Sequence, residues 1–374
     1  MKTFLTILIG VLLAGGLFLF AFYKTPQERD FAAHLKQAQT GDEAAMLAVA
    51  RDYVEGTGTA VDLPQALAWY QQAAARGSSR AAWELAHIYS DGVHIPAEPE
   101  TALAYLQAAA QENDSVSQYE LGQWYAQGKN APQHTGQALF WYLQAAQSGS
   151  TPAKTALTQA ENEPIYAEVM RFWDTLQRAH NQDPQAQLET GQAYRYGTPV
   201  LRDDETAFTW FQKAWETSEK NLSQAAFELS DQYAKGEGTE KDENKAAEFL
   251  AYAAELQNPS AQYQQGTIAY ADNPPRWEDA FAWFSNAATQ GHAQAQYMTG
   301  FMLLQGQGTQ KSVPLALRFF EQAAEQNDAS AQYVLGQIYT KGLGVKKDEQ
   351  TGKQWLEKAA ENGNEAAQEL LNNL

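Results

Sequence analysis

An internal period of about 36 residues constrains this chain more than any other feature. Ten small residues mark the starts of the predicted units, and their successive spacings are 36, 36, 36, 33, 39, 36, 34, 36 and 36 residues. These residues are Ala45, Ala81, Ser117, Ala153, Ala186, Ala225, Ala261, Ala295, Ala331 and Ala367. A fixed period of this length is typical of repeat arrays, in which each unit packs against its neighbours.

A second marker keeps the same register. An aromatic residue lies 24 residues after the small residue in seven units, and 22 residues after it in the unit that contains Trp283. The seven are Trp69, Tyr105, Trp141, Trp210, Phe249, Phe319 and Trp355. Chance does not keep two markers in register over such a length, so the chain is a true repeat array.

The unit beginning at Ala331 shows what each repeat contains. Ala331, Leu335 and Tyr339 are spaced by four residues, which places them on one face of a helix. Gly342 and Gly344 follow, and glycine ends helices because it adopts positive φ without strain. The first half of the unit therefore predicts a helix and a glycine turn.

The second half of the same unit predicts another helix. Asp348 stands where an N-cap residue would lie, and Trp355, Ala359 and Ala360 then form the predicted buried side. The small alanines let the two helices approach closely, while the aromatic residue fills the outer gap. Each repeat is thus predicted to be an antiparallel helix pair.

This pattern, LGxxY, then GxG, then an aromatic residue followed by AA and glycine, resembles the Sel1-like repeat, a relative of the tetratricopeptide repeat. The resemblance covers roughly residues 41–374. It implies an all-α, right-handed superhelical solenoid whose concave face is lined mainly by the first helices. Sel1-like proteins are mostly adaptors and assembly factors, and their bacterial members include immunity proteins that neutralise secreted toxins.

The repeats and their interruptions divide the chain into seven predicted segments. The frame that begins at Ala153 is degenerate, since it lacks the LG pair and the GxG turn. The segments are a short flank (1–3), a transmembrane signal anchor (4–23), a linker and capping helix (24–40), repeats 1–3 (41–150), the degenerate repeat (151–185), repeats 4–8 (186–364) and a C-terminal capping helix (365–374).

Residues 4–23 are 20 consecutive residues without a charged side chain, enough for one helical crossing of a bilayer. A cleaved signal peptide is the alternative, but Ala21 lies between Phe20 and Phe22 and makes a poor cleavage site. We expect an uncleaved, single-pass inner-membrane anchor with the repeats in the periplasm. Cleavage would instead give a secreted or periplasmic protein.

Charge and cysteine content exclude several classes of function. The formal net charge is −19, which argues against nucleic acid as a partner because phosphate binding needs a basic surface. The chain has no cysteine, so it has neither disulfides nor thiolate chemistry. The negative charge serves solubility in one interpretation and steers a basic partner in the other.

Searches for catalytic patterns give no candidate. The GxG pairs follow predicted helices and lack a third glycine, so they do not form a dinucleotide fingerprint. None of the six histidines belongs to an HExxH motif or pairs with another histidine four residues away, and no GxSxG motif is present. We therefore expect no enzymatic activity, no cofactor, no metal site and no small-molecule substrate.

Candidate binding residues are aromatic residues outside the repeat's own aromatic positions, because such residues often anchor protein interfaces. Burial in the repeats is the alternative for each of them. The degenerate frame has two interpretations. Its sequence has either drifted at a place where the superhelix merely bends, or it forms a kink that shapes a partner-binding site. The candidates are Trp124, Tyr166, Trp173, Tyr196, Trp277 and Phe301.

The sequence thus predicts a non-catalytic, membrane-tethered scaffold or adaptor that binds a protein or peptide on the concave face of a solenoid. One specific form is an immunity protein against a basic secreted toxin. The alternative is a structural or assembly factor of a cell-envelope complex. Because the regular repeat positions are explained by the fold, we expect the degenerate middle of the chain and the exposed faces of the first helices to bind the partner.

Overall fold

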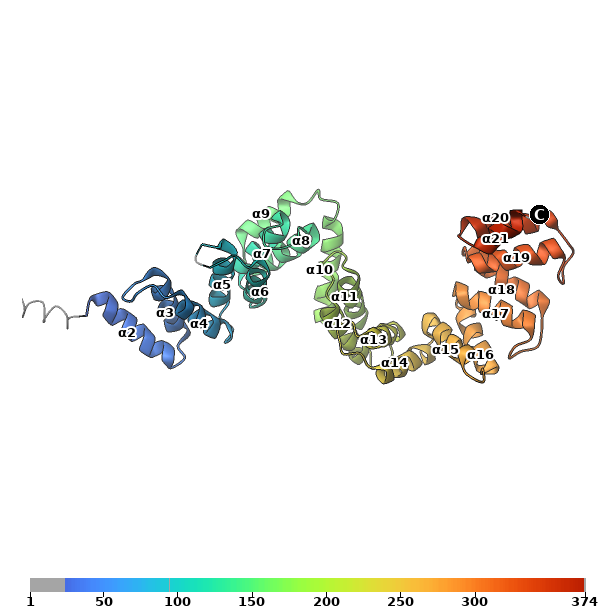
Figure 1. Ribbon diagram of the computed structural model, residues 1–374, viewed down its shortest axis with the longest axis horizontal. Coiled ribbons are helices and arrows are strands. Elements are labelled where there is room, and N and C mark those ends of the chain that lie inside the picture. Colours follow the sequence, from blue (N-terminus) through green and yellow to red (C-terminus); the bar gives the residue numbers. More distant parts are fainter. Residues whose placement is uncertain (1–23, 94, 373–374) are drawn as a thin grey trace, which may run out of the picture. The chain divides into compact units, whose positions relative to one another are not determined.

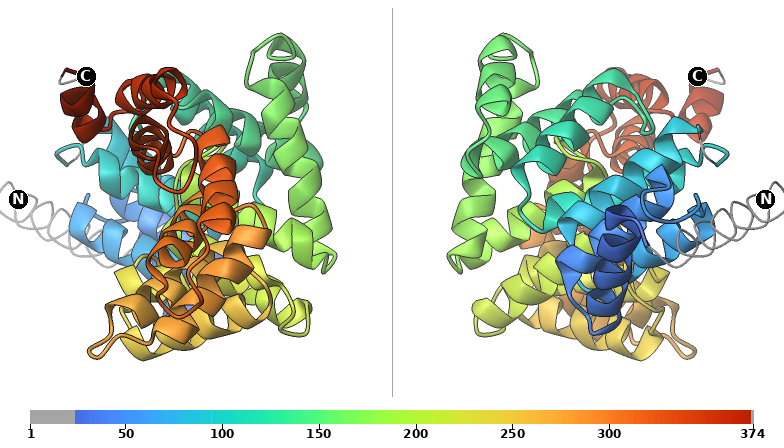
Figure 2. Two further views of the ribbon diagram at one scale, coloured as in Figure 1. Left: turned by 90° about the vertical axis from the view of Figure 1, so that its right-hand side faces the viewer. Right: turned by 90° about the vertical axis from the view of Figure 1, so that its left-hand side faces the viewer.

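A computed structural model describes residues 24–93 and 95–372 (Figure 1). These residues form twenty α-helices, α2 to α21, and no strand, which confirms the predicted all-helical solenoid. Within each part of the chain, consecutive helices fold back beside one another, as further views show (Figure 2). The predicted anchor, residues 4–23, lies outside the described residues. No helix among the described residues has the length and apolar character needed to cross a membrane.

Eight of the predicted repeats are antiparallel helix pairs. All of these helices contain 12 to 14 residues. The pairs are α3 (Glu43–Glu55) with α4 (Leu63–Ala74), α5 (Ser79–Asp91) with α6 (Pro99–Gln111), α7 (Ser115–Gln127) with α8 (Thr135–Gln147), α11 (Pro184–Tyr196) with α12 (Asp204–Thr217), α13 (Ser223–Lys235) with α14 (Glu243–Glu255), α15 (Pro259–Ala271) with α16 (Trp277–Thr289), α17 (Ala293–Gln305) with α18 (Val313–Glu325) and α19 (Ala329–Lys341) with α20 (Glu349–Glu361).

The degenerate frame also forms two helices, but they differ from those of the regular pairs. Helix α9 (Thr151–Gln159) has only 9 residues, and α10 (Tyr166–His180) has 15. The chain divides within α10 into two compact units. Unit 1 contains the described residues up to Arg171 together with Pro199–Leu201, and unit 2 contains Phe172–Thr198 and the residues from Arg202 onward.

Capping interactions set the helix boundaries as the sequence predicts. The carboxylate of Asp348 accepts a hydrogen bond from the backbone N–H of Thr351 at 3.0 Å and so begins α20. Gly342 ends α19 with φ of 68°, and Gly344 follows in the same turn with φ of 75°. Both glycines therefore take the left-handed conformation that a helix-ending turn requires.

The two helices of a pair meet where a glycine of the first faces a large side chain of the second. A Cβ atom on Gly336 would lie 2.5 Å from Cγ of Leu356, and one on Gly191 would lie 2.6 Å from Cε1 of Phe211. Both large residues directly follow a marker aromatic residue and are fully buried. The marker itself is often only partly buried, as for Trp355, so the deepest contact lies one residue later than the sequence indicates.

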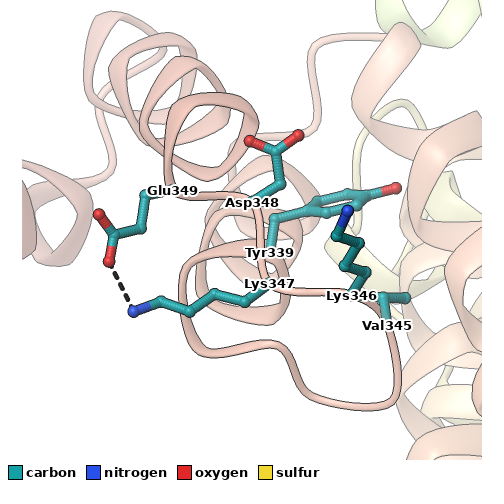
Figure 3. Close-up of a pocket in the computed structure, with 6 residues that line it drawn as sticks. All are labelled: Tyr339, Val345, Lys346, Lys347, Asp348 and Glu349. Carbon is teal, nitrogen blue, oxygen red and sulfur yellow. Dashed lines mark ion pairs between the residues drawn. The ribbon is translucent and has the colours of Figure 1, made fainter.

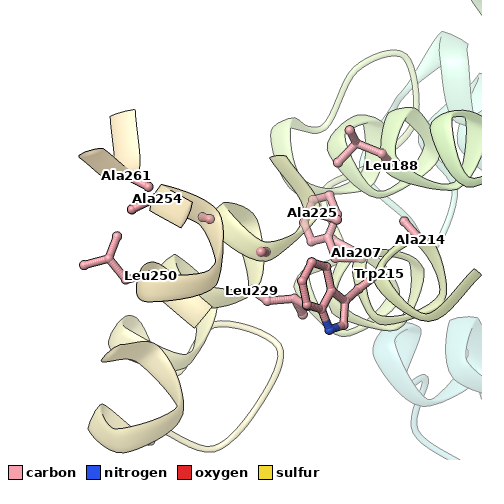
Figure 4. Close-up of a cluster of buried hydrophobic side chains, with 12 residues drawn as sticks. Leu188, Ala207, Ala214, Trp215, Ala225, Leu229, Leu250, Ala254 and Ala261 are labelled. Carbon is pink, nitrogen blue, oxygen red and sulfur yellow. The ribbon is translucent and has the colours of Figure 1, made fainter. Parts of the chain in front are cut away.

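Buried side chains of successive repeats can belong to one core cluster. In unit 2, a cluster of buried side chains extends from Leu188 on α11 to Ala261 on α15 (Figure 4). Leu229 and Trp215, which lie on neighbouring repeats, both belong to it. A repeat therefore buries its apolar surface against its neighbours as well as within its own pair, as expected of a solenoid.

A buried glutamine also links repeats. The residue after the small marker is glutamine in six units. In five of them its Nε2 donates to an alanine carbonyl eight residues earlier, near the end of the preceding second helix. The donor–acceptor distances are 3.0 to 3.2 Å. The five residues are Gln118, Gln187, Gln262, Gln296 and Gln332.

Single helices cover the first and last repeats. Helix α2 (Pro26–Gln39) packs Phe31 and Leu35 against the core of the first repeat. Helix α21 (Glu365–Asn372) packs Leu370 and Leu371 against the core of the last. These four side chains face inward, as the sequence indicates for capping helices.

Candidate protein-binding surfaces

The first helices α11 and α13 of unit 2 carry a buried ion network. Nη1 of Arg195 lies 2.9 Å from Oε2 of Glu228, and Nη2 of the same arginine pairs with Asp231 and with Glu237. The side chains of Arg195 and Glu228 are only 9% and 5% exposed. A guanidinium that loses water needs several charged partners, and the three carboxylates supply them.

The network continues to the surface around its edge. Nζ of Lys235 lies 2.8 Å from Asp231, one helical turn earlier on α13. Arg202 contacts Glu237 at 3.4 Å. Because the outer groups remain in solvent, they contribute little to stability but leave charged atoms available for a partner.

Tyr196, a predicted binding residue, stands beside this network. Its side chain is 66% exposed, an unusual position for a large aromatic residue. Partial burial and the neighbouring Glu228 carboxylate raise the pKa of its hydroxyl. The hydroxyl therefore stays protonated at neutral pH and can donate a hydrogen bond from an exposed ring, a common combination in protein interfaces.

A second cluster lies on the first helices α5 and α7 of unit 1. Nε1 of Trp83 donates to Glu120 at 2.8 Å, and Nε2 of His87 lies 3.0 Å from the same carboxylate. The rings of Trp83 and His87 are 4.1 Å apart, and the guanidinium of Arg80 lies 4.5 Å from the centre of the Trp83 ring. Trp83, His87 and Glu120 of this cluster are half-buried, and Arg80 is exposed.

The electrostatics of the second cluster favour an ionised Glu120. Burial alone would raise the pKa of this carboxyl, but the hydrogen bond and charge of His87 and the hydrogen bond from Trp83 outweigh burial and lower the pKa. Glu120 is therefore a fixed negative charge at neutral pH, bonded by the ring nitrogens of both Trp83 and His87.

The other predicted binding residues have different surroundings. Trp124 on α7 is 2% exposed, and its ring lies 5.8 Å from Nζ of Lys129. Tyr166 and Trp173, on α10, are both half-buried. The six candidates are distributed over five helices, α7, α10, α11, α16 and α17.

The remaining two candidates belong to the cores of their repeats. Trp277 at the start of α16 is half-buried, with its ring 4.8 Å from that of Tyr270. Phe301 on α17 is also half-buried and packs against the core cluster that contains Leu335. The centres of the Phe301 and Tyr297 rings are 6.4 Å apart. Of the six, Tyr196 therefore offers the largest exposed fraction.

Sequence reasoning missed the residues that surround these aromatic side chains. His87 and Glu120 are 33 residues apart, as are Arg195 and Glu228. Arg195 and Asp231 are separated by 36 residues. Complementary polar residues separated by close to one period were a signal that could have located both clusters, because the repeat places such residues on adjacent first helices.

A shallow pocket of about 660 Å³ lies in the last repeat (Figure 3). Tyr339 and the segment from Val345 to Glu349 line it, and Lys347 pairs with Glu349 at 2.6 Å. Within the described part of the chain, no group of three His, Asp or Glu side chains has an arrangement that could hold a metal ion.

Comparison with known proteins identifies the repeats. A family model described as the Sel1 repeat matches residues 43–78, 79–114, 115–150, 184–215 and 329–364. A model described as plant tetratrico peptide repeats matches residues 238–314. The chain is also 32% identical, over 145 residues, to an uncharacterised protein of Neisseria meningitidis serogroup B. That match covers 37% of this chain and 28% of the relative, so the chain spans well under half of that protein's length.

Two solved structures are similar to this chain over most of its length. A Sel1 repeat protein from Oxalobacter formigenes is 28% identical, with 91% of this chain and 90% of that chain covered and a TM-score of 0.47. The protective antigen c5321 of uropathogenic Escherichia coli is 25% identical, with coverages of 92% and 82% and a TM-score of 0.39. Five stretches of this chain are therefore Sel1 repeats.

Proposed function

We propose that this protein is a non-catalytic scaffold that binds a partner protein through its first helices. The observation that carries the proposal is the exposed ring of Tyr196 beside the buried Arg195 network. An exposed aromatic residue next to fixed charges provides both contact area and orientation for a protein partner. The Trp83 cluster offers a second surface of the same kind in unit 1.

The charge of the chain favours a basic partner. The formal net charge of −19 attracts positively charged proteins over a distance set by the ionic strength. Around Tyr196, the three carboxylates Glu228, Asp231 and Glu237 all lie on or just after α13. Asp231 and Glu237 remain partly exposed, so a lysine- or arginine-rich surface could contact these two carboxylates.

The proposal includes attachment to the inner membrane. Residues 4–23 carry no charged side chain and are long enough for one membrane-spanning helix. With the start of the chain in the cytoplasm, the repeats would face the periplasm, where they could meet secreted or envelope proteins. The more specific form of the proposal is an immunity protein that blocks a basic secreted toxin. An assembly factor for an envelope complex is the alternative function.

Affinity purification of the full chain from detergent-solubilised envelopes tests the proposal. Tyr196→Ala should lose a protein that the wild type retains, since the ring is exposed and its removal leaves the core intact. Tyr252→Ala is the matched control, because Tyr252 is also an exposed tyrosine of unit 2 but lies on the second helix α14. Retention of the same proteins by wild type and Tyr196→Ala would argue against this surface.

The degenerate frame provides a separate prediction. If α10 presents Trp173 to a partner, Trp173→Ala should weaken capture of that partner without lowering the melting temperature by many degrees. The measurement is a pull-down together with thermal unfolding monitored by circular dichroism. A large loss of stability would show instead that this half-buried tryptophan belongs to the core.

A further inference from the structure

A pocket of about 520 Å³ lies in unit 2, and Tyr196 is not among the residues that line it. It lies between the end of α10, the start of α11 and the last turns of α12. The rings of His180 and Trp210 meet edge to face at 5.2 Å, and Nζ of Lys213 lies 4.5 Å from the centre of the Trp210 ring. The residues that line it include His180, Gln187, Trp210, Lys213, Glu216 and Thr217.

Gln187 has an unmet hydrogen-bonding requirement at this pocket. The residue is only 4% exposed, and its Nε2 donates to the carbonyl oxygen of Ala179 at 3.2 Å, which fixes the orientation of the amide. Its Oε1 is buried and has no hydrogen-bond partner within the protein. A buried carbonyl oxygen without a donor costs free energy, so a ligand that supplies an N–H group is favoured here.

Three other repeats show what completes this arrangement. The Oε1 atoms of Gln262, Gln296 and Gln332 accept hydrogen bonds from the side-chain amides of Gln290, Gln326 and Asn362, at 2.7, 2.8 and 2.9 Å. Each donor lies seven residues after the marker aromatic residue, at the end of its second helix. The equivalent residue in the pocket is Thr217, which lines it but has no amide.

From this comparison within one molecule, we infer that the pocket binds the side-chain carboxamide of a glutamine or asparagine from a partner protein. The partner's N–H group donates to Oε1 of Gln187 and takes the place that Gln326 and Asn362 fill in their own repeats. The flanking part of the partner side chain lies among the other lining residues, which include His180 and Lys213. This surface is separate from the one that contains Tyr196, so either can exist without the other.

The charges at the pocket favour a neutral ligand. Lys213 stands on one part of the lining and Glu216 on another, so an added ammonium group or carboxylate would meet a like charge as well as an opposite one. A carboxylate also has no hydrogen to donate to Oε1 of Gln187 at neutral pH, whereas a carboxamide has two. The carboxamide thus meets the hydrogen-bond requirement without placing a second charge in the pocket.

The test uses full-length protein in detergent micelles with ¹⁵N-labelled tryptophan. The probes are the N-acetyl methylamides of glutamine, glutamate, lysine and leucine. The indole N–H resonance of Trp210, assigned with Trp210→Phe, should shift saturably with the glutamine probe and far less with the other three. Equal responses to all four probes, or no response to glutamine, would overturn the inference and leave water as the occupant.

Two matched variants complete the test. Thr217→Gln places an amide at the position of Gln326 and should abolish the saturable shift because the site is then filled from within. Thr217→Glu has the same length but no donor, so its Trp210 resonance should still respond to the glutamine probe. Equal responses from both variants would contradict the inference, whatever becomes of the Tyr196 surface.

Discussion

At the scale of single residues, the side chain at the end of a second helix decides whether a buried glutamine has all its hydrogen bonds. In unit 1, Gln118 donates to the carbonyl of Ala110 at 3.1 Å, but its own Oε1 has no partner within the protein. Ser148 stands seven residues after Trp141, the position that Asn362 fills in the last repeat. The serine side chain is shorter and does not provide the bond.

Ser148→Asn should therefore stabilise the protein. The new side-chain amide can donate to Oε1 of Gln118 as Asn362 donates to Gln332, and the gain expected for one such bond is about 1 kcal/mol. Urea unfolding monitored by circular dichroism measures the change. Ser148→Asp has nearly the same shape without the N–H donor and should give no such gain, so equal gains from both variants would refute the explanation.

A second prediction concerns the acid side of the stability profile. The pKa of Glu120 lies below its ordinary value of 4.5. This carboxylate therefore contributes stability that is present above the unfolded-state pKa and is lost as the pH falls through the lower folded-state pKa. Glu120→Gln should consequently lose less stability than the wild type as the pH falls below 4.5.

Urea midpoints measured from neutral pH down to about pH 3 compare the two proteins. Trp83→Phe, which removes one hydrogen bond to the carboxylate, should show an acid-dependent loss between those of wild type and Glu120→Gln. Parallel pH profiles for wild type and Glu120→Gln would show that the contacts of Glu120 do not alter its titration.

Individual residues also show where sequence reasoning reached its limit. The glycines of the turns and the N-cap Asp348 could be predicted, because their roles depend on local backbone geometry. The interactions of Gln118 and Arg195 could not, since they depend on which residues of adjacent repeats meet. Tyr196 was a candidate because it fits no repeat position, yet the same criterion also selected the buried Trp124.

At the scale of helices, the lengths and caps repeat closely, and the exceptions lie at the ends and in the middle. Helix α21 has 8 residues, too few for stability on its own, so its packing must hold it in place. Leu370 and Leu371 supply that packing against Leu356 and Ala359 of α20. This short helix therefore protects the core of the last repeat from water.

Replacing both Leu370 and Leu371 by aspartate should release α21 and expose that core. We expect faster amide hydrogen exchange in α19 and α20, with little change in unit 1, because solenoid repeats are coupled mainly to their neighbours. Hydrogen exchange followed by mass spectrometry resolves the two regions. Unchanged exchange in α20 would show that its core is protected without α21.

At the scale of the whole molecule, the chain combines an acidic repeat array with an apolar N-terminal segment. The chain has a formal net charge of −19, and residues 4–23 contain no charged side chain. If this segment anchors the protein, the full chain should remain with the membrane fraction after a high-salt wash and keep its N-terminus. Cell fractionation with N-terminal sequencing provides the measurement. A soluble periplasmic form that begins after residue 20 would rule out the anchor.

The hydrogen bond from a buried glutamine to the preceding repeat has a consequence for the evolution of such proteins. Its acceptor lies 8 residues before the glutamine, and the amide that completes it lies about 30 residues after, so one copied period carries a new glutamine and its completing amide. Duplication or loss of a period can then lengthen or shorten the array without the need for new contacts to evolve. The first-helix surfaces remain free to diverge, and the number of binding surfaces can change separately from their chemistry.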